Sequence, residues 1–254
     1  MSRSSENIAS FHIESWHSLL DAPAPPPTAR AKEAPSAEAS GADTTHDCPP
    51  ALLGVSPDLT KLLYDTLVYP YAGVRVRIKR LNMSARAFEK AKLEGSEKGF
   101  FLESAAGAIT CLIPLAKTFE AFGFPYPYRR DVSHEHSYFV GWGQHLLQED
   151  PANKKVYTEL KVGNSSCTSD IVTVGHDSTR RAYEVTLSTG NVLSNATKYT
   201  KTDFVQIVFL CRDYQLREAV RACCREGGLD ADLLAKLEFM QFSTLANRQR
   251  RLSL

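Results

Sequence analysis

The chain has 254 residues, of which 43% are hydrophobic and 23% are charged, and its formal net charge is +1. This composition suits one or two globular domains of roughly 100–150 residues and excludes a fibrous or wholly disordered chain. No apolar run approaches the ~18–20 residues of a membrane span, and no secretory leader pattern opens the sequence. We therefore expect a cytoplasmic protein without a membrane partner.

The six cysteines are spread along the chain without a CxxC pair or regular spacing. This pattern favours neither a zinc ribbon nor a disulfide framework. We expect reduced and mostly buried thiols, because an unpaired cysteine behaves as a small hydrophobic side chain.

Residues 1–50 are rich in Ala, Pro, Ser, Thr and Glu. Such a segment cannot bury enough apolar surface to offset the entropy of ordering it, so it is predicted to be disordered. Within it, the stretch NIASFHIESWHSLL repeats apolar residues at roughly helical spacing. This stretch is either an amphipathic helix that docks on a partner or a transient helix without one.

Residues 51–128 begin with helix signals. Ser56 followed by Pro57 is typical of an N-cap and a first helical position, and predicts a helix over residues 57–68. A short helix through residues 78–81 and a tight turn are expected next.

A longer helix is then predicted to start at the cap Ser84 and to end at Gly99 in the left-handed conformation. Two strands, over residues 100–104 and 108–114, are expected to follow around a small-residue turn. Three helices followed by a two-stranded wing are the order of a winged helix-turn-helix.

Basic side chains gather on the second and third of these helices, where a recognition helix would meet DNA. The candidate nucleic-acid-binding residues are Arg77, Lys79, Arg80, Arg86 and Lys90. Their contacts with phosphates would weaken steeply with salt. The alternative is a charged, solvated face without a ligand, because Glu89, Glu94 and Glu97 dilute the patch.

Residues 129–254 predict a second unit with the order α β β β α β α, an α/β domain with a mixed sheet. The predicted helices and strands cover residues 134–150, 155–162, 169–174, 181–187, 191–200, 204–211 and 214–226. One or two closing helices are expected over residues 230–252. The run at 204–211 is hydrophobic throughout, as in a central strand covered on both faces.

In this second unit Asp170 heads the second strand and Glu184 lies within the third. With the stretches HEHSYFV, SDIVTV, RAYEVTL and NVLSNATKY, the unit resembles the PD-(D/E)XK nuclease-like superfamily. It is similar, more narrowly, to the C-terminal modules of HerA-like ATPases and of plasmid replication-relaxation proteins, in which a winged helix likewise precedes a nuclease-like domain. The resemblance covers about residues 51–225.

The resemblance implies a winged helix-turn-helix over residues 51–128 and a restriction-endonuclease-like mixed-sheet α/β domain over residues 129–254. It also implies a DNA-associated protein from a mobile-element or defence-like context. In such nucleases two carboxylates hold one or two Mg²⁺ ions, which activate water and neutralise the phosphate. The implied metal ligands here are Asp170, Glu184 and the backbone oxygen of Val185.

A third catalytic residue, a lysine two positions after the glutamate, stabilises the developing charge in these nucleases. Thr186 stands at that position, and a neutral hydroxyl cannot supply the charge. Lys198 shares a helix face with Asn191 and Asn195 and could supply the ammonium instead. Alternatively, Glu159 and Lys161, which alternate onto one face of the first strand, border the same pocket.

Structural alternatives remain for these residues. Asp170 and Glu184 can be solvated strand-end carboxylates, or partners of Arg180 or Arg181. His134 and His136 are expected to serve capping and packing, because no cysteine or third histidine is spaced to complete a metal site.

These patterns predict a DNA-binding protein with a nuclease-like domain, a candidate Mg²⁺-dependent endonuclease whose motif is incomplete. The alternative is a non-enzymatic adaptor that docks on an ATPase or a replication protein. Since the chain holds no GxxxxGK[ST] motif, that ATPase would be a separate polypeptide.

Overall fold

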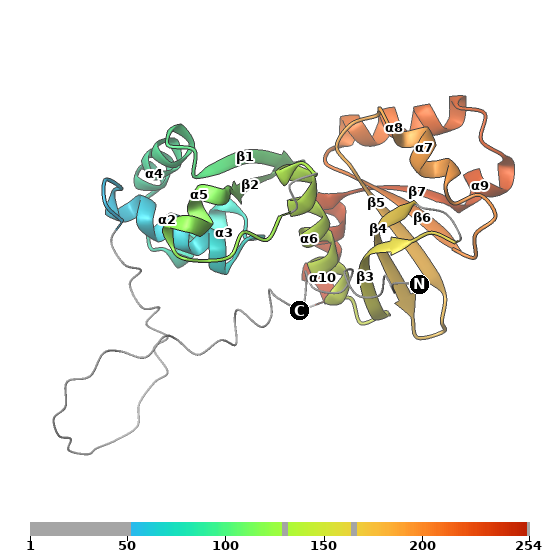
Figure 1. Ribbon diagram of the computed structural model, residues 1–254, viewed down its shortest axis with the longest axis horizontal. Helices are drawn as coiled ribbons and strands as arrows, with labels where there is room; N and C mark the ends of the chain where they lie inside the picture. The colour runs from blue at the N-terminus through green and yellow to red at the C-terminus, as the bar shows by residue number, and fades with distance from the viewer. Residues whose placement is uncertain (1–51, 129–131, 164–166, 253–254) are drawn as a thin grey trace, which may run out of the picture. The chain divides into compact units, whose positions relative to one another are not determined.

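The computed structural model describes residues 52–128, 132–163 and 167–252, which belong to one compact unit of α/β fold. It contains a two-stranded antiparallel sheet and a five-stranded mixed sheet (Figure 1). The segment predicted to be disordered, with its amphipathic stretch, lies outside the described residues. Within those residues, no helix has the length and apolar character needed to cross a bilayer.

The N-terminal part of the unit has the predicted order of three helices and a β-hairpin. Its elements are α2 (Pro57–Val68), α3 (Val74–Arg80), α4 (Ala85–Glu97), β1 (Phe101–Ala106), β2 (Ile109–Pro114) and α5 (Ala116–Ala121). The predicted caps are confirmed: Ser56 Oγ accepts a hydrogen bond from the Leu59 N–H, and Ser84 Oγ accepts one from the Ala87 N–H. Gly99 has a φ of 68°, so it ends α4 as expected.

Two features of this part were not predicted. Helix α3 begins four residues earlier than the spacing indicated, after the extended N-cap Gly73. The short helix α5 follows the hairpin directly, and its Phe119 is buried.

The C-terminal part begins with a helix and forms the five-stranded sheet. Its elements are α6 (His134–Gln148), β3 (Asn153–Lys161), β4 (Thr168–Gly175), β5 (Arg180–Thr186), α7 (Val192–Thr197), β6 (Gln206–Cys211), α8 (Tyr214–Glu226), α9 (Ala231–Lys236), β7 (Leu237–Gln241) and α10 (Phe242–Leu252). The strand order is β3-β4-β5-β6-β7, antiparallel up to β5 and parallel from β5 onward. The predicted order of elements up to α8 is confirmed.

The prediction of only helices over residues 230–252 is wrong, because β7 lies between α9 and α10. Asp230 caps α9, but that helix ends after six residues, where Leu237 turns to an extended conformation. Strand β7 then pairs in parallel with β6, from Ile207↔Leu237 to Cys211↔Gln241. A partner about 30 residues away decides this conformation, and local spacing cannot report such pairing.

Helices cover both faces of the sheet. Helices α6 and α10 lie on one face, and α7 and α8 lie on the other (Figure 1). Tyr183 and Val185 of β5 pack into the core on the α6 side, whereas Ala182 packs into the core on the α7 side. Since side chains alternate along a strand, Glu184 faces the α7 side.

The β1–β2 hairpin packs against α6 instead of standing free. Ala106 and Ile113 of the hairpin belong to the same hydrophobic core as Phe139 and Trp142 of α6. The Tyr138 hydroxyl also donates to the carbonyl of Pro70 at 2.8 Å. The hairpin therefore contributes to the core under α6, while Leu112 of the same hairpin belongs to a separate core with residues of α2 and α4.

Candidate functional site

The two carboxylates of the proposed motif lie where β4 and β5 separate. Backbone pairing of these strands runs from Val174↔Arg180 to Ile171↔Tyr183. Asp170 and Glu184 come next in that register. At this point a side-chain hydrogen bond replaces the backbone pairing between the two strands. Asp170 Oδ2 accepts a hydrogen bond from the Val185 N–H at 2.8 Å.

Glu184 is the buried member of the pair, with only 1% of its surface exposed. The Lys198 ammonium lies 2.7 Å from its Oε2, and the Tyr199 hydroxyl donates to its Oε1. Lys198 also donates to the carbonyl of Thr168 on β4 at 2.6 Å. The predicted helix-borne lysine therefore does reach the glutamate, and an unpredicted tyrosine beside it binds the other oxygen.

Burial raises the pKa of Glu184 to about 7, and the negative charge of Asp170 adds to this rise. The Lys198 ammonium and the hydrogen bonds from Lys198 and Tyr199 act in the opposite direction. Burial therefore outweighs the two favourable partners.

Asp170 is more open and meets a histidine from α6. His136 Nε2 lies 3.3 Å from Asp170 Oδ1, and the two side chains are 27% and 23% exposed. Burial by itself lowers the pKa of His136. The hydrogen bond and charge of Asp170, with the charges of Glu184 and Glu159, outweigh burial and raise it.

The expectation that both histidines serve only capping and packing is wrong for His136 and right for His134. The His134 ring stacks on Tyr128 and meets Tyr126 edge to face. His136 joins the carboxylate pair instead. One signal in the sequence pointed to it: His136 stands in the first turn of a helix, in the stretch HEHSYFV.

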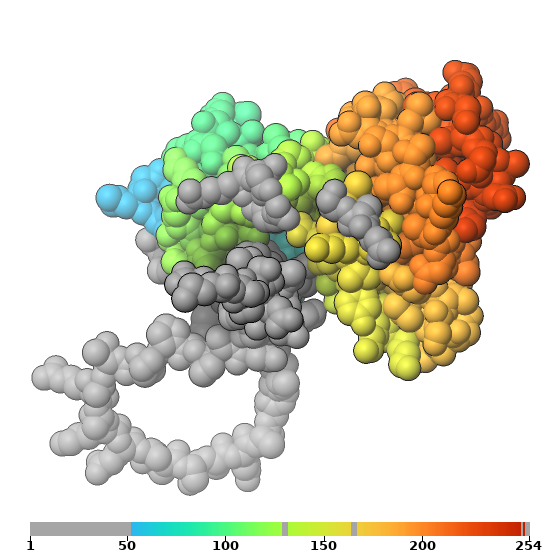
Figure 2. All heavy atoms as spheres, turned by 45° about the vertical axis from the view of Figure 1, so that its right-hand side comes forward, coloured from blue at the N-terminus to red at the C-terminus, as the bar shows by residue number. Residues whose placement is uncertain are grey.

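The Thr186 hydroxyl donates to the backbone carbonyl of Glu184 at 3.1 Å, so it does not join the side-chain cluster. Glu159 is exposed and stands opposite Asp170 in the β3–β4 register, with a left-handed φ of 51°. The yellow strands β3 and β4 and the orange residues that follow β5 adjoin on the face shown in Figure 2. Two lysines were proposed to replace the lysine that is absent at position 186. Lys198 contacts Glu184, whereas Lys161 lies exposed on β3.

The donor atoms have the chemistry that Mg²⁺ prefers, because carboxylate and carbonyl oxygens are its usual ligands. The Val185 N–H points toward Asp170, and in an extended strand the carbonyl of the same residue points to the same edge. However, all four carboxylate oxygens of Asp170 and Glu184 already contact protein donors. Nowhere in residues 52–128, 132–163 or 167–252 do three His, Cys, Asp or Glu side chains converge to hold an ion. In this arrangement the residues do not fit Mg²⁺.

The five predicted DNA-contacting residues fall into two groups, and Arg77 and Arg80 form the first. Arg77 is fully buried and donates to the Asp65 carboxylate and to the carbonyls of Ala72, Tyr69 and Pro70. Its predicted contact with phosphates is therefore wrong: Arg77 ties α3 to the end of α2. Arg80 is mostly covered, since it binds Asp65 at 2.6 Å and lies over the Tyr69 ring.

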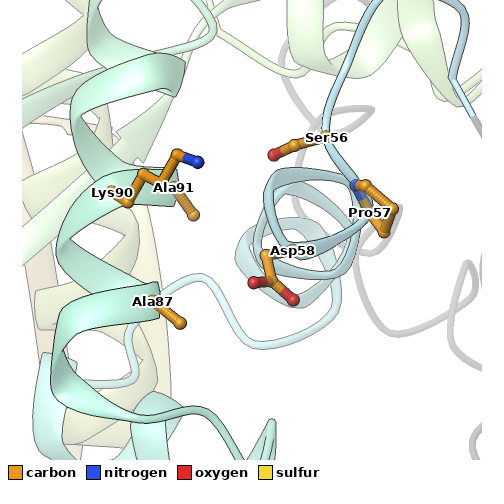
Figure 3. Close-up of a pocket in the computed structure, with 6 residues that line it drawn as sticks. All are labelled: Ser56, Pro57, Asp58, Ala87, Lys90 and Ala91. Carbon is orange, nitrogen blue, oxygen red and sulfur yellow. The ribbon is translucent and has the colours of Figure 1, made fainter.

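Lys79, Arg86 and Lys90 form the second group and are exposed. Lys90 borders a hollow of about 260 Å³ between the start of α2 and the middle of α4. Ala87 and Ala91 of α4 face Ser56 across this hollow (Figure 3). The exposed basic residues thus lie on α3 and α4, as the sequence predicted for the second and third helices.

Comparisons with protein-family models, with curated proteins and with solved structures gave no match for this chain.

Proposed function

We propose that the protein binds DNA through α3 and α4, and that its nuclease-like part does not cut the DNA in this closed arrangement. The absence of cleavage is supported by the buried Glu184, whose two carboxylate oxygens are held by Lys198 and Tyr199. A phosphodiester approaching the site would meet the partly exposed Asp170 and His136, while Glu184 stays behind them.

The DNA-binding half rests on Lys79, Arg86 and Lys90. Helix α4 has 13 residues and is therefore about 20 Å long, which suits a helix lying in a major groove. The buried contacts of Arg77 with Asp65 hold α3 against α2, so the exposed residues stand on a rigid frame. Phosphate contacts from three cations give modest, salt-dependent affinity with little sequence information.

The binding surface is tested by fluorescence anisotropy with labelled duplex DNA at several salt concentrations. The variant Lys79→Gln/Arg86→Gln/Lys90→Gln should bind about tenfold or more weakly than wild type, and its salt dependence should be shallower. Lys154→Gln/Lys155→Gln/Lys161→Gln removes the same charge from exposed positions of β3 and should bind like wild type. Equal losses in both variants would mean that only net charge matters. No affinity in the wild type would favour the adaptor function.

The absence of cutting is tested by incubating plasmid and single-stranded DNA with the protein and Mg²⁺ or Mn²⁺. Wild type should produce no more nicks than Asp170→Asn/Glu184→Gln, a pair of near-isosteric changes that removes both charges. Metal-dependent nicking that disappears in this variant would make the protein an endonuclease, with Lys198 as its lysine.

A further inference from the structure

The residues around Glu184 form a small charged cluster whose members come from five elements: β3, β4, β5, α6 and the end of α7. The carboxylate pair is Asp170 and Glu184, and the charged or titratable groups that face it are Glu159, His136, Lys198 and Tyr199. Asp170, Glu184 and Glu159 are acidic, and the Lys198 ammonium is the cation held directly against the buried Glu184 carboxylate. Lys198 caps the end of α7, and Tyr199 follows it directly.

We propose that Lys198 and Tyr199 act as a built-in substitute for a divalent cation at the Asp170 and Glu184 pair. Their ammonium and hydroxyl donate to the two Glu184 oxygens that a metal would use. The same ammonium donates to the Thr168 carbonyl, so it also ties α7 to the β4 end of the gap. Besides the proposed DNA binding, Lys198 and Tyr199 would thus exclude a metal ion from the carboxylate pair, and their removal would admit one.

The electrostatics favour a cation once these two groups are removed. Without Lys198, Glu184 would have no direct cationic partner, and burial together with the repulsion from Asp170 would oppose its negative charge unless another cation balanced it. A bound divalent cation relieves that repulsion and is often the largest local charge in such a site. The Val185 carbonyl, on the edge that faces Asp170, is a further oxygen donor.

The test is Mn²⁺ titration by calorimetry, with the EPR signal of free Mn²⁺ as a second measure of binding. Four proteins are compared: wild type, Lys198→Ala/Tyr199→Phe, the same double variant with Glu184→Gln, and Lys201→Ala. Lys201 is an exposed lysine three residues beyond Lys198, so its removal controls for charge alone. We expect the double variant to bind Mn²⁺ at least about tenfold more tightly than wild type, and the other two variants to match wild type.

Several results would overturn the proposal. They are saturable binding by wild type well below about 1 mM Mn²⁺, a folded double variant without gain, or a gain that survives Glu184→Gln. If the double variant does not fold by circular dichroism, Tyr199→Phe alone frees Oε1 and should still show a smaller gain, and its failure to do so counts against the proposal. DNA anisotropy on the same samples reports the proposed function separately, since the cluster lies outside α3 and α4.

Discussion

At the scale of single residues, Glu184 shows why a buried carboxylate is weak evidence for stability. Taking its charge out of water is costly, and the attraction of Lys198 and the hydrogen bond from Tyr199 offset only part of that cost. The pKa of about 7 expresses this balance. At neutral pH the cluster therefore stands close to the point where Glu184 changes charge.

The pH dependence of stability should follow from this pKa. In the unfolded chain the pKa of Glu184 is near 4.5, and folding raises it to about 7, so the folded state holds the proton more tightly. The stabilising contribution of protonated Glu184 is thus complete below pH 4.5 and is lost as pH rises through 7. Relative to Glu184→Gln, wild type should lose on the order of 3 kcal/mol of unfolding free energy between pH 5 and 8.

Urea denaturation of both proteins at pH 5 and pH 8 measures this difference. His136, whose pKa is also raised, contributes in the same direction, and most of that contribution is common to both proteins because Asp170 raises this pKa more than Glu184 does. A difference that stays constant between the two pH values would show that Glu184 does not change charge in this range.

At the scale of secondary-structure elements, α2 and α4 approach closely because Gly95 has no side chain. A Cβ built at Gly95 would lie 2.5 Å from a Phe101 ring carbon and 2.9 Å from a Leu59 methyl group. Both neighbours are buried and have little room to move. The glycine therefore sits inside a helix despite its poor helix propensity.

Gly95→Ala should lower the thermal unfolding midpoint. Alanine gains about 1 kcal/mol in helix propensity, but overpacking against two buried side chains costs about 1–3 kcal/mol, and the loss should prevail. Gly190→Ala, in a turn, is the control for a glycine with open space around it, since a Cβ there meets no atom within 4 Å. An increase in the melting temperature of Gly95→Ala would show that Phe101 and Leu59 rearrange without penalty.

At the scale of the whole molecule, the β1–β2 hairpin of the N-terminal part is a component of the core beneath the large sheet. Ile113, fully buried in β2, belongs to the same core as Trp142 of α6. The two parts should therefore unfold together, in one cooperative transition.

Ile113→Ala tests this coupling, because it removes apolar volume from the hairpin and should cost about 2–5 kcal/mol. In a Trp16→Phe background, Trp142 fluorescence reports the α6 region and circular dichroism reports the whole unit. Both signals should shift to the same lower denaturant midpoint. If the Trp142 fluorescence midpoint stayed at its wild-type value while the circular dichroism showed two transitions, the N-terminal and C-terminal parts would unfold independently.

The features that the sequence predicts well depend on neighbours along the chain. The caps Ser56 and Ser84 act on N–H groups three residues away, and Lys198 was selected by its face on one short helix. The features it misses depend on distant partners. His136 contacts Asp170, which is 34 residues away in the sequence. Arg77 was predicted to be a surface residue, but it is buried by its contacts with Asp65 and three backbone carbonyls.

The left-handed Glu159 gives β3 a role on both sides of the sheet. Val156 packs toward α6 and Leu160 packs toward α7, although residues four apart in a regular strand share a face. The single positive φ between them turns the strand over. Without this kink, Leu160 would lie on the α6 side of the sheet instead of the α7 side. Inserting or deleting a residue in β3 would also move Leu160 to the other face, so this edge strand should tolerate substitutions better than changes in length.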